Sequence, residues 1–258
     1  GLSVVCVVGL VAGLTAAFAF NNTPAKPKAS ASASPSASAS ASASTSAAAV
    51  AEPATHCTYT TKGVAAAAKK VSLPSATPNY KAAYTAAIHT NLGTININLL
   101  NSKATCTVNS FVHLAEAGYF NNTQCHRLVT SGPYVLQCGD PTATATAKLT
   151  CSTTSTIGAG TPGYDFASEN LTGAKYPAGT VAMATEGTAS RNGSQFFIVY
   201  KDSTSGLTAS YTPFATVSSG LDIVQNVAKD GYSCQYAQSG GGAPKKKVII
   251  DSVTIKKT

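Results

Sequence analysis

The residue with the most distinctive chemical setting in this sequence is an arginine. The chain contains two arginines, Arg127 and Arg191, and Arg127 lies within the strand-like run Cys125–Val129. A guanidinium is costly to bury without a partner, so Arg127 must face an acceptor or a water-filled groove. In a groove, its fixed fork of N–H donors would be available to a substrate. An arginine on the solvent face of a strand is the simpler alternative.

Other common catalytic arrangements are absent from the sequence. There is no G-x-S-x-G nucleophile elbow, no glycine-rich phosphate loop after a strand and no H-E-x-x-H motif. The 10 acidic residues are scattered without an obvious pair for general acid–base hydrolysis. No C-x-x-C pair occurs and no histidine lies at metal-ligand spacing, which argues against a zinc site.

Three ordered motifs give the arginine a context. They are C-H-R-L at 125–128, Y-V-L-Q-C-G-D-P at 134–141 and N-G-S-Q-F-F at 192–197. Together they resemble the F-H-R, M-x-Q-G-G-D and N-G-S-Q-F-F motifs of the cyclophilin-type peptidyl-prolyl isomerases. Asn109-Ser110-Phe111 is similar to that family's N-F helix. The resemblance covers roughly Ala86 to Ile255.

The resemblance implies a reaction that needs no nucleophile, cofactor or metal. Rotation about an X–Pro amide is opposed by a barrier of about 18–20 kcal/mol, because resonance gives the C–N bond double-bond character. An isomerase must bind the twisted amide better than either planar form. By the resemblance, Arg127 is the catalytic residue, directing its donors at the proline nitrogen as that nitrogen regains its lone pair.

The resemblance also implies a set of substrate-binding residues around Arg127. Gln137 would orient Arg127 or the peptide carbonyl, and His126 should point to the opposite face by strand alternation. Taken alone, Phe197 and Leu207 would be interpreted as plain core residues. The full predicted set is His126, Tyr134, Val135, Gln137, Ala184, Thr185, Gln195, Phe197, Leu207 and Tyr211.

The sequence departs from the family pattern in three places. Gly206 stands nearest to the family's groove-edge Trp, so cyclosporin-type ligands are expected to bind weakly. The segment after Asp140 has alanines where the family has glycines, and extra residues follow around Cys151. Because alanine disfavours positive φ, that loop must take another path. The turn between Arg127 and Tyr134 is also longer than in the common form.

Hydrophobic periodicity indicates which elements carry these residues. Thr94–Leu99 alternates polar and apolar residues and predicts a strand, with a hairpin partner at Ala86–Thr90. Val108, Phe111, Val112 and Ala115 have helical spacing and predict a helix that Gly118 ends.

Further elements complete the predicted fold. A second helix is predicted over Asp222–Ala228, and strands over Gln124–Val129, Tyr134–Gly139, Thr180–Ala184, Gln195–Tyr200, Phe214–Val217 and Val248–Ile255. This pattern is typical of an all-β fold. The expected architecture, cyclophilin-like, is a closed eight-stranded antiparallel barrel capped by two α-helices.

Composition narrows the class of protein. Charged residues are 11% of the chain, too few for a coiled coil or a Glu/Lys-rich bundle. The net charge of +8 owes much to lysines near the C-terminus, at 245–247 and 256–257. This basic segment lacks the interleaved aromatics of a nucleic-acid-binding face, so we interpret it as solvated surface and expect no nucleic-acid partner.

The N-terminal part predicts export. Residues 1–20 are uncharged and are predicted to be a signal peptide or a membrane anchor. The A-x-A at 17–19 favours a signal peptide and the length of the run favours a retained anchor, so both alternatives stay open. Residues 21–53 are predicted to be an Ala/Ser-rich disordered tether. Residues 54–85 would be an N-terminal extension of the barrel, and 86–258 the isomerase domain. The protein is therefore expected to be membrane-anchored on the extracytoplasmic side or secreted.

Cysteine usage agrees with export. Six cysteines lie outside the hydrophobic segment, an even number that suggests disulfides. If Arg127 and Gln137 share a face, alternation places Cys125 on that face and Cys138 on the other, which argues against a Cys125–Cys138 bond. Cys151 and Cys234, both in loops, are a candidate pair.

The sequence thus predicts a monomeric prolyl isomerase whose partners are proline-containing peptides and unfolded exported proteins, with the N-terminal segment in contact with the membrane. A module that binds proline-containing peptides without accelerating their isomerisation is the main alternative, and Arg127 is the feature that such a binder would not need. A structural cell-surface protein with a decayed barrel is a third.

Overall fold

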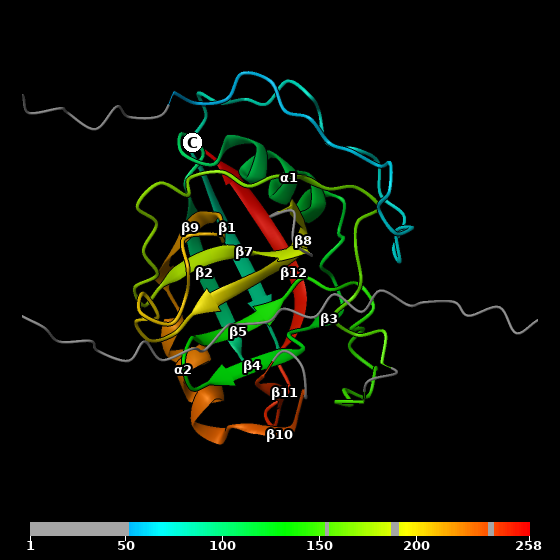
Figure 1. The fold of residues 1–258 in the computed structure, drawn as a ribbon, viewed down its shortest axis with the longest axis vertical. Coiled ribbons are helices and arrows are strands. Elements are labelled where there is room, and N and C mark those ends of the chain that lie inside the picture. Colours follow the sequence, from blue (N-terminus) through cyan, green and yellow to red (C-terminus); the bar gives the residue numbers. More distant parts are fainter. Residues whose placement is uncertain (1–51, 153–154, 187–190, 237–239) are drawn as a thin grey trace, which may run out of the picture.

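The structure is a computed structural model that describes residues 52–152, 155–186, 191–236 and 240–258. The predicted signal peptide or anchor and most of the predicted tether lie outside these residues. Within them, no helix has the length and apolar character needed to cross a membrane. Figure 1 shows a strongly curved sheet with one helix at each end.

Twelve strands of the described chain form one sheet, in which every pairing is antiparallel. The path of the sheet runs β10-β11-β4-β5-β8-β7-β9-β2-β1-β12-β3, and β6 pairs with β8. The strands are β1 (Tyr84–Thr90), β2 (Gly93–Leu99), β3 (Thr123–Gln124), β4 (Arg127–Thr130), β5 (Tyr134–Cys138), β6 (Phe166–Ala167), β7 (Thr180–Glu186), β8 (Arg191–Val199), β9 (Pro213–Ser219), β10 (Tyr232–Gln235), β11 (Gly242–Pro244) and β12 (Ile249–Lys257).

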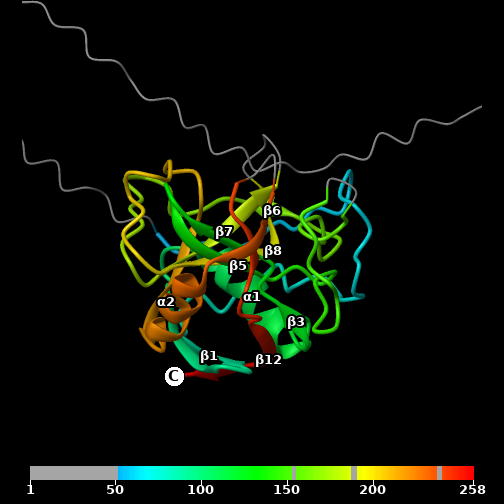
Figure 2. The same cartoon turned by 90° about the horizontal axis from the view of Figure 1, so that it is seen from below.

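The predicted fold class is confirmed: a mostly antiparallel β-sheet with two helices. The eight predicted strands correspond to β4, β5, β8, β7, β9, β2, β1 and β12, which are consecutive in the sheet. The helices are α1 (Thr105–Glu116) and α2 (Leu221–Asp230), at opposite ends of the sheet in Figure 1. Figure 2 shows the fold from the end at which α2 lies. The short strands β6, β10 and β11 were not predicted.

The sheet curves around one large apolar core. Ile95, Ile97 and Leu99 alternate along β2 and point inward as their period-two spacing predicts. From α1, Phe111 packs against Phe196 and Phe214, with ring centroids 5.7 and 5.2 Å away. Helix α1 ends where predicted, because Gly118 takes the left-handed conformation (φ 63°) that follows many helix ends.

One strand that the sequence predicts as continuous is interrupted in the structure. Gln124–Val129 is two strands: β3 pairs with β12, and β4 pairs with β5. Between them the backbone changes partner, since the Cys125 N–H donates to the Val248 carbonyl and the His126 N–H to the Gln137 carbonyl. The sequence run looks continuous because both short strands are buried.

The same change of partner corrects the prediction on cysteine pairing. Cys125 and Cys138 form a disulfide, with their Cα atoms 4.0 Å apart. Strict alternation of side chains applies only along a regular ladder, and Cys125 precedes the first residue of β4. The alternation that argued against the bond therefore does not apply to the side chain of Cys125. Cys151 and Cys234 pair as expected, and Cys57 pairs with Cys106.

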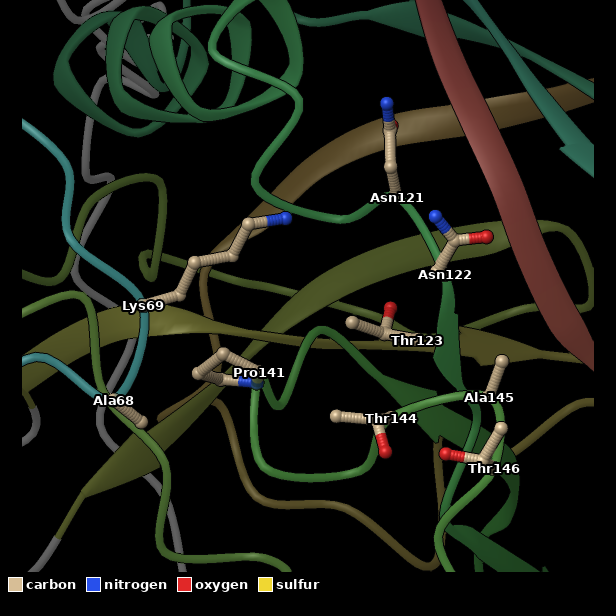
Figure 3. A pocket seen from close by; sticks show the side chains of 9 residues that line it. All are labelled: Ala68, Lys69, Asn121, Asn122, Thr123, Pro141, Thr144, Ala145 and Thr146. Atoms are coloured by element: carbon tan, nitrogen blue, oxygen red, sulfur yellow. The ribbon is translucent and has the colours of Figure 1, made fainter.

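Residues 52–83 wrap around α1 and the loop that follows it. Lys69 anchors this extension, because its Nζ donates to the carbonyls of Gly118 and Tyr119 at 2.6 and 3.0 Å. Burial lowers the pKa of this ammonium. Together with the segments 121–123 and 144–146 and with Pro141, Ala68 and Lys69 line a pocket of about 420 Å³ (Figure 3). The extension therefore belongs to the folded body.

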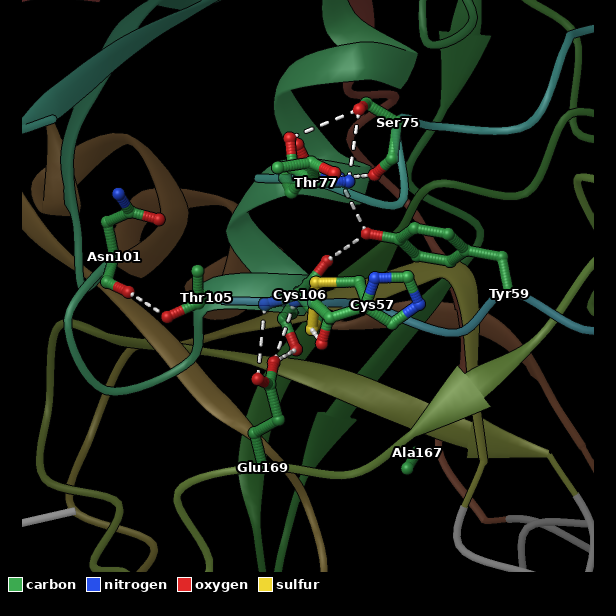
Figure 4. Close-up of a disulfide and its surroundings, with 12 residues drawn as sticks. Cys57, Tyr59, Ser75, Thr77, Asn101, Thr105, Cys106, Ala167 and Glu169 are labelled. Atoms are coloured by element: carbon green, nitrogen blue, oxygen red, sulfur yellow. Dashed lines mark hydrogen bonds between the residues drawn. A yellow bond between two sulfur atoms is a disulfide. The ribbon is translucent and has the colours of Figure 1, made fainter. Parts of the chain in front are cut away.

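A second anchor fixes the extension to the start of α1 (Figure 4). The Cys57–Cys106 disulfide joins the two, and Tyr59 Oη donates to the Cys106 carbonyl at 2.9 Å. The residue before α1, Ala104, has no side chain that could cap the helix. The carboxylate of Glu169 takes the place of a capping side chain, because it accepts from the N–H groups of Cys106 and Thr107 at 3.1 and 2.7 Å.

We predict that Glu169→Ala lowers the free energy of unfolding by about 1–2 kcal/mol, because it leaves the first N–H groups of α1 without their acceptor. Thermal melting followed by circular dichroism measures the loss. Glu116→Ala, at the exposed C-terminal end of the same helix, is the matched control. Equal melting temperatures for wild type and Glu169→Ala would contradict the assignment.

Candidate active site

Arg127 is the first residue of β4 and lies directly opposite Gln137 on β5. Its side chain is only 4% exposed. The Nη1 group donates to Gln137 Oε1 at 3.0 Å, and Nε donates to the Gly240 carbonyl at 2.9 Å. The guanidinium is therefore held by acceptors from two different parts of the chain.

The hydrogen bonds continue beyond Gln137 in one direction. Gln137 Nε2 donates to Gln195 Oε1 at 2.9 Å, and Gln195 Nε2 donates to the carbonyls of Gly158 and Gly160 at 2.9 and 3.1 Å. Arginine can only donate, so Gln137 must turn its oxygen to Arg127 and its NH₂ to Gln195. The charge on Arg127 thus sets the orientation of the side-chain amides of Gln137 and Gln195.

An apolar cluster lies on the same face of the sheet as this chain of donors. Alternation separates it from the core: Val135 and Phe197 point outward, and their neighbours Leu136 and Phe196 point inward. Phe197 pairs with Gln137 across β5 and β8, and its ring contacts Tyr211 edge-to-face at 5.5 Å. The buried members of the cluster are Val129, Val135, Tyr176, Ala182, Ala184, Phe197, Val199 and Leu207.

Burial changes the acid–base properties of this face, but its charge stays positive. Burial lowers the pKa of Arg127 to about 10, an effect that the nearby Tyr211 and Tyr236 oppose. Burial also raises the pKa of both tyrosines, against the opposing effect of Arg127. At neutral pH the guanidinium is therefore protonated and both phenols are neutral, which leaves one cation beside an apolar surface.

The structure brings most of the predicted site residues together. Arg127, Gln137 and Gln195 form the hydrogen-bonded chain. Beside them, the apolar cluster contains four predicted residues and packs against a fifth at its edge. These are Val135, Ala184, Phe197 and Leu207, with Tyr211 at the edge. Thr185 follows Ala184 on β7 and is buried.

Two predicted residues lie elsewhere. The Tyr134 ring faces the other side of β5, edge-to-face with Tyr200 at 5.9 Å and with Lys201 Nζ 4.5 Å from its centroid. The strand alternation that turns Val135 toward the cluster turns Tyr134 away from it. His126 precedes β4 and is buried outside the apolar cluster, and within the described chain its Nδ1 has no hydrogen-bond partner.

Comparison with known proteins agrees with this geometry. The family model described as cyclophilin type peptidyl-prolyl cis-trans isomerase/CLD matches residues 85–255. The chain belongs to the cyclophilin-type peptidyl-prolyl cis-trans isomerase family. The match includes β4, β5 and β8, the three strands that carry Arg127, Gln137 and Gln195.

Curated relatives agree with the family model. It is 41% identical to the probable peptidyl-prolyl cis-trans isomerase B of Mycobacterium leprae over 207 residues, which cover 73% of this chain and 63% of the relative. Identity to the Mycobacterium tuberculosis counterpart is 40%, over 73% of this chain and 60% of that protein. The chain thus spans less than two thirds of the length of these relatives.

The fold also matches a solved cyclophilin. A crystal structure of a cyclophilin type isomerase from Cryptosporidium parvum aligns with a TM-score of 0.53 at 24% identity, covering 68% of this chain and 99% of that one. The same protein was solved in the presence of the dipeptide ala-pro, and that structure aligns equally well at 25% identity.

Several contacts of this cyclophilin site were not predicted from the sequence. The carbonyls of Gly158, Gly160 and Gly240 are acceptors in the donor chain. Tyr176 supports the rim, since its Oη donates to the Tyr211 carbonyl at 2.8 Å. Backbone acceptors carry no sequence motif. The signal nearest to them in the sequence was the candidate cysteine pair, Cys151 and Cys234.

The groove edge explains one departure from the family. A Cβ atom at Gly206 would lie 2.8 Å from the backbone of Gly132 and from the Pro133 nitrogen. The turn between β4 and β5 therefore occupies the space that a side chain at position 206 would need. A glycine at position 206 is therefore the residue that this turn accommodates.

His126 makes stability depend on pH. Burial lowers its pKa to about 4; the Asp140 carboxylate opposes the shift and Arg127 adds to it. In the unfolded chain a histidine titrates near 6.5, so between these values the unfolded state binds the extra proton. The contribution of this histidine to stability is therefore fully present above about pH 6.5 and is lost as the pH drops toward 4.

We predict that His126→Gln removes up to about 3 kcal/mol of this loss in the free energy of unfolding between pH 7 and pH 4. Urea unfolding at a series of pH values measures the slope for each protein. His56→Gln, at an exposed histidine, should retain the wild-type slope. Identical slopes for wild type and His126→Gln would show that the buried imidazole does not cause the dependence.

Proposed function

We propose that this protein catalyses the cis–trans isomerisation of peptide bonds that precede proline, with Arg127 stabilising the twisted amide. The observation that carries the proposal is a protonated, hydrogen-bonded guanidinium beside an apolar cluster on the outer face of the sheet. Membership of the cyclophilin family and the likeness to probable isomerases of two mycobacteria support it.

Each part of the site has a task in this reaction. As the amide twists, the proline nitrogen becomes pyramidal and can accept a hydrogen bond from Arg127. A charge-assisted bond contributes about 1.5–3 kcal/mol, whereas an acceleration of 10⁵ needs roughly 7 kcal/mol. Arginine alone is therefore insufficient. The remainder would come from excluding water from the amide and from holding the flanking peptide still.

The apolar cluster would supply that remainder. Val135, Phe197 and Leu207 offer the surface that a proline ring needs, and Gln137 fixes the guanidinium beside it. Tyr211 would bound the rim, and the β7 edge at Ala184 and Thr185 would meet the peptide backbone. The related Cryptosporidium protein, solved in the presence of ala-pro, supports proline-containing peptides as ligands.

Folding of exported proteins is the role we propose for this activity. Three disulfides in the described residues indicate an oxidising, extracytoplasmic location. Proline isomerisation is slow enough to limit folding there, because it takes tens of seconds or more without a catalyst. A protein that is secreted, or anchored by residues 1–20, would meet its unfolded clients in that compartment.

Replacing the arginine tests the proposal. In a protease-coupled X–Pro isomerisation assay, we expect Arg127→Ala to lower kcat/KM by about 10- to 100-fold, because one charge-assisted bond to the transition state is lost. Arg191→Ala is the matched control: it removes the chain's other arginine, which pairs with Asp165 at 2.5 Å, and should retain activity.

Equal rates for wild type and Arg127→Ala would contradict the assigned role. If neither protein accelerates isomerisation while both bind a proline-containing peptide, the binding-module alternative would replace the proposed enzyme. Circular dichroism of each variant confirms that a lost rate does not reflect a lost fold.

The filled space beside Gly206 predicts a pharmacological property. We expect cyclosporin-type ligands to inhibit the isomerase only weakly, because the β4–β5 turn leaves no room at position 206 for a side chain that could contact them. Inhibition curves in the same isomerisation assay measure this. Inhibition at sub-micromolar concentration would show that the groove edge is formed differently.

A further inference from the structure

Two segments outside the eight predicted strands reach the hydrogen-bonded chain of Arg127, Gln137 and Gln195. One is the hairpin β10–β11, which follows α2, and the other is the loop 141–163, which follows β5. The Cys151–Cys234 disulfide joins them across 83 residues of sequence. Each segment thus carries one half of a cross-link and at least one acceptor for the site.

The hairpin supplies the acceptor for Arg127 itself. The Gly240 carbonyl accepts from Arg127 Nε at 2.9 Å, and Tyr236 Oη donates to the His126 carbonyl at 3.1 Å. These contacts place the hairpin over the start of β4, and Figure 1 shows β11 beside that strand. The hairpin therefore contacts Arg127 from the β11 side of β4, whereas Gln137 contacts it from the β5 side.

Among the described residues, the strand pairing of the hairpin is irregular. Its two strands pair at Tyr232–Pro244 and Gln235–Gly242 with an irregularity between them, Gly242–Leu128 pairs β11 with β4, and the N–H groups of Tyr236 and Gly240 donate to the carbonyls of Gly241 and Tyr236. A two-stranded ribbon of this size is marginally stable on its own. The covalent bond at Cys234 therefore adds to the non-covalent contacts that hold Gly240 in place.

At its other end the disulfide is attached to a loop that Asp140 contacts on both sides of Cys151. The buried Asp140 carboxylate accepts from the Thr142 N–H at 2.8 Å, and also from the Gly158 N–H. This fixes the Gly158 and Gly160 carbonyls that accept from Gln195. Gly160 has no room for a side chain, since a Cβ there would lie 2.0 Å from Asp140 Oδ1.

We propose that the Cys151–Cys234 disulfide is a positioning element for Arg127, a proposal that rests on the isomerase function above. By tying the hairpin to the Asp140-anchored loop, the bond keeps the Gly240 carbonyl on Nε and holds the guanidinium in one orientation before substrate arrives. A free arginine side chain has many rotamers, and fixing it in advance removes that cost from the transition state.

The test compares two disulfides of one chain. In Cys151→Ser/Cys234→Ser we expect kcat for an X–Pro peptide to fall about tenfold with KM within about twofold, because the apolar surface that binds proline is intact. Cys57→Ser/Cys106→Ser, which frees the extension from α1, should keep the wild-type kcat even if its melting temperature drops. Tyr236→Phe, which loosens the hairpin and leaves every disulfide intact, should lower kcat in the same direction.

Two further readouts separate positioning from general loosening. The effects of Arg127→Ala and of Cys151→Ser/Cys234→Ser should not add, because both act through one side chain. The Arg127 Nε–H signal in ¹⁵N NMR spectra, assigned by its loss in Arg127→Ala, should exchange slowly with solvent in wild type and fast without the disulfide. The NMR measurement does not depend on turnover.

The outcomes distinguish this proposal from the function on which it rests. An active wild type whose kcat and Nε–H exchange are unchanged by loss of Cys151–Cys234 would overturn the positioning role alone. A wild type without isomerase activity would overturn both. Equal losses of kcat in the two disulfide variants would overturn the role as well, since they would show a general effect of stability.

Discussion

The burial of one guanidinium sets the conditions for the whole site. Arginine has five donors and no acceptor, so each buried N–H needs an oxygen aimed at it. Gln137 and Gly240 provide two of these oxygens, and Gln195 and the loop carbonyls then satisfy Gln137 in turn. The function of the site therefore depends on how β4 pairs with β5 and how β5 pairs with β8. A shift of one residue in either register would turn Gln137 or its neighbours to the other face of the sheet.

The same strands build the core and the site. Along β5 and β8 every second residue points inward to the 30 buried residues of the main core, and the residues between them form the outer cluster. Both faces of these strands are apolar, which explains why the run Tyr134–Cys138 shows no alternation in its hydrophobicity. The outer face can be apolar because its side chains bury one another and are packed against by Ala174 and Tyr211.

How far the sequence predicted this site depended on the kind of group involved. Side chains in motifs were found: Arg127, Gln137 and Gln195 lie in contact as the resemblance implied. Tyr134 was misplaced because a motif gives residue types and does not say which face each occupies. The Cys125–Cys138 bond was missed because the chain changes strand partner at Cys125, which hydrophobicity does not reveal. The carbonyls of Gly158 and Gly240 had no signature at all, since any residue offers a carbonyl and only the path of the loop selects it.

The pairing of β1 with β12 has a consequence for how the molecule forms. Tyr84 lies opposite Lys257 and Ile88 opposite Val253, so the sheet joins the beginning of the domain to residues made more than a hundred and fifty positions later. Contacts this distant in sequence form slowly, because a long segment must be ordered to make them. A chain still emerging from the ribosome lacks β12 and cannot complete its sheet. The edge of β1 that faces β12 therefore stays unpaired until residues 249–257 have been made, and the sheet takes its final form only then.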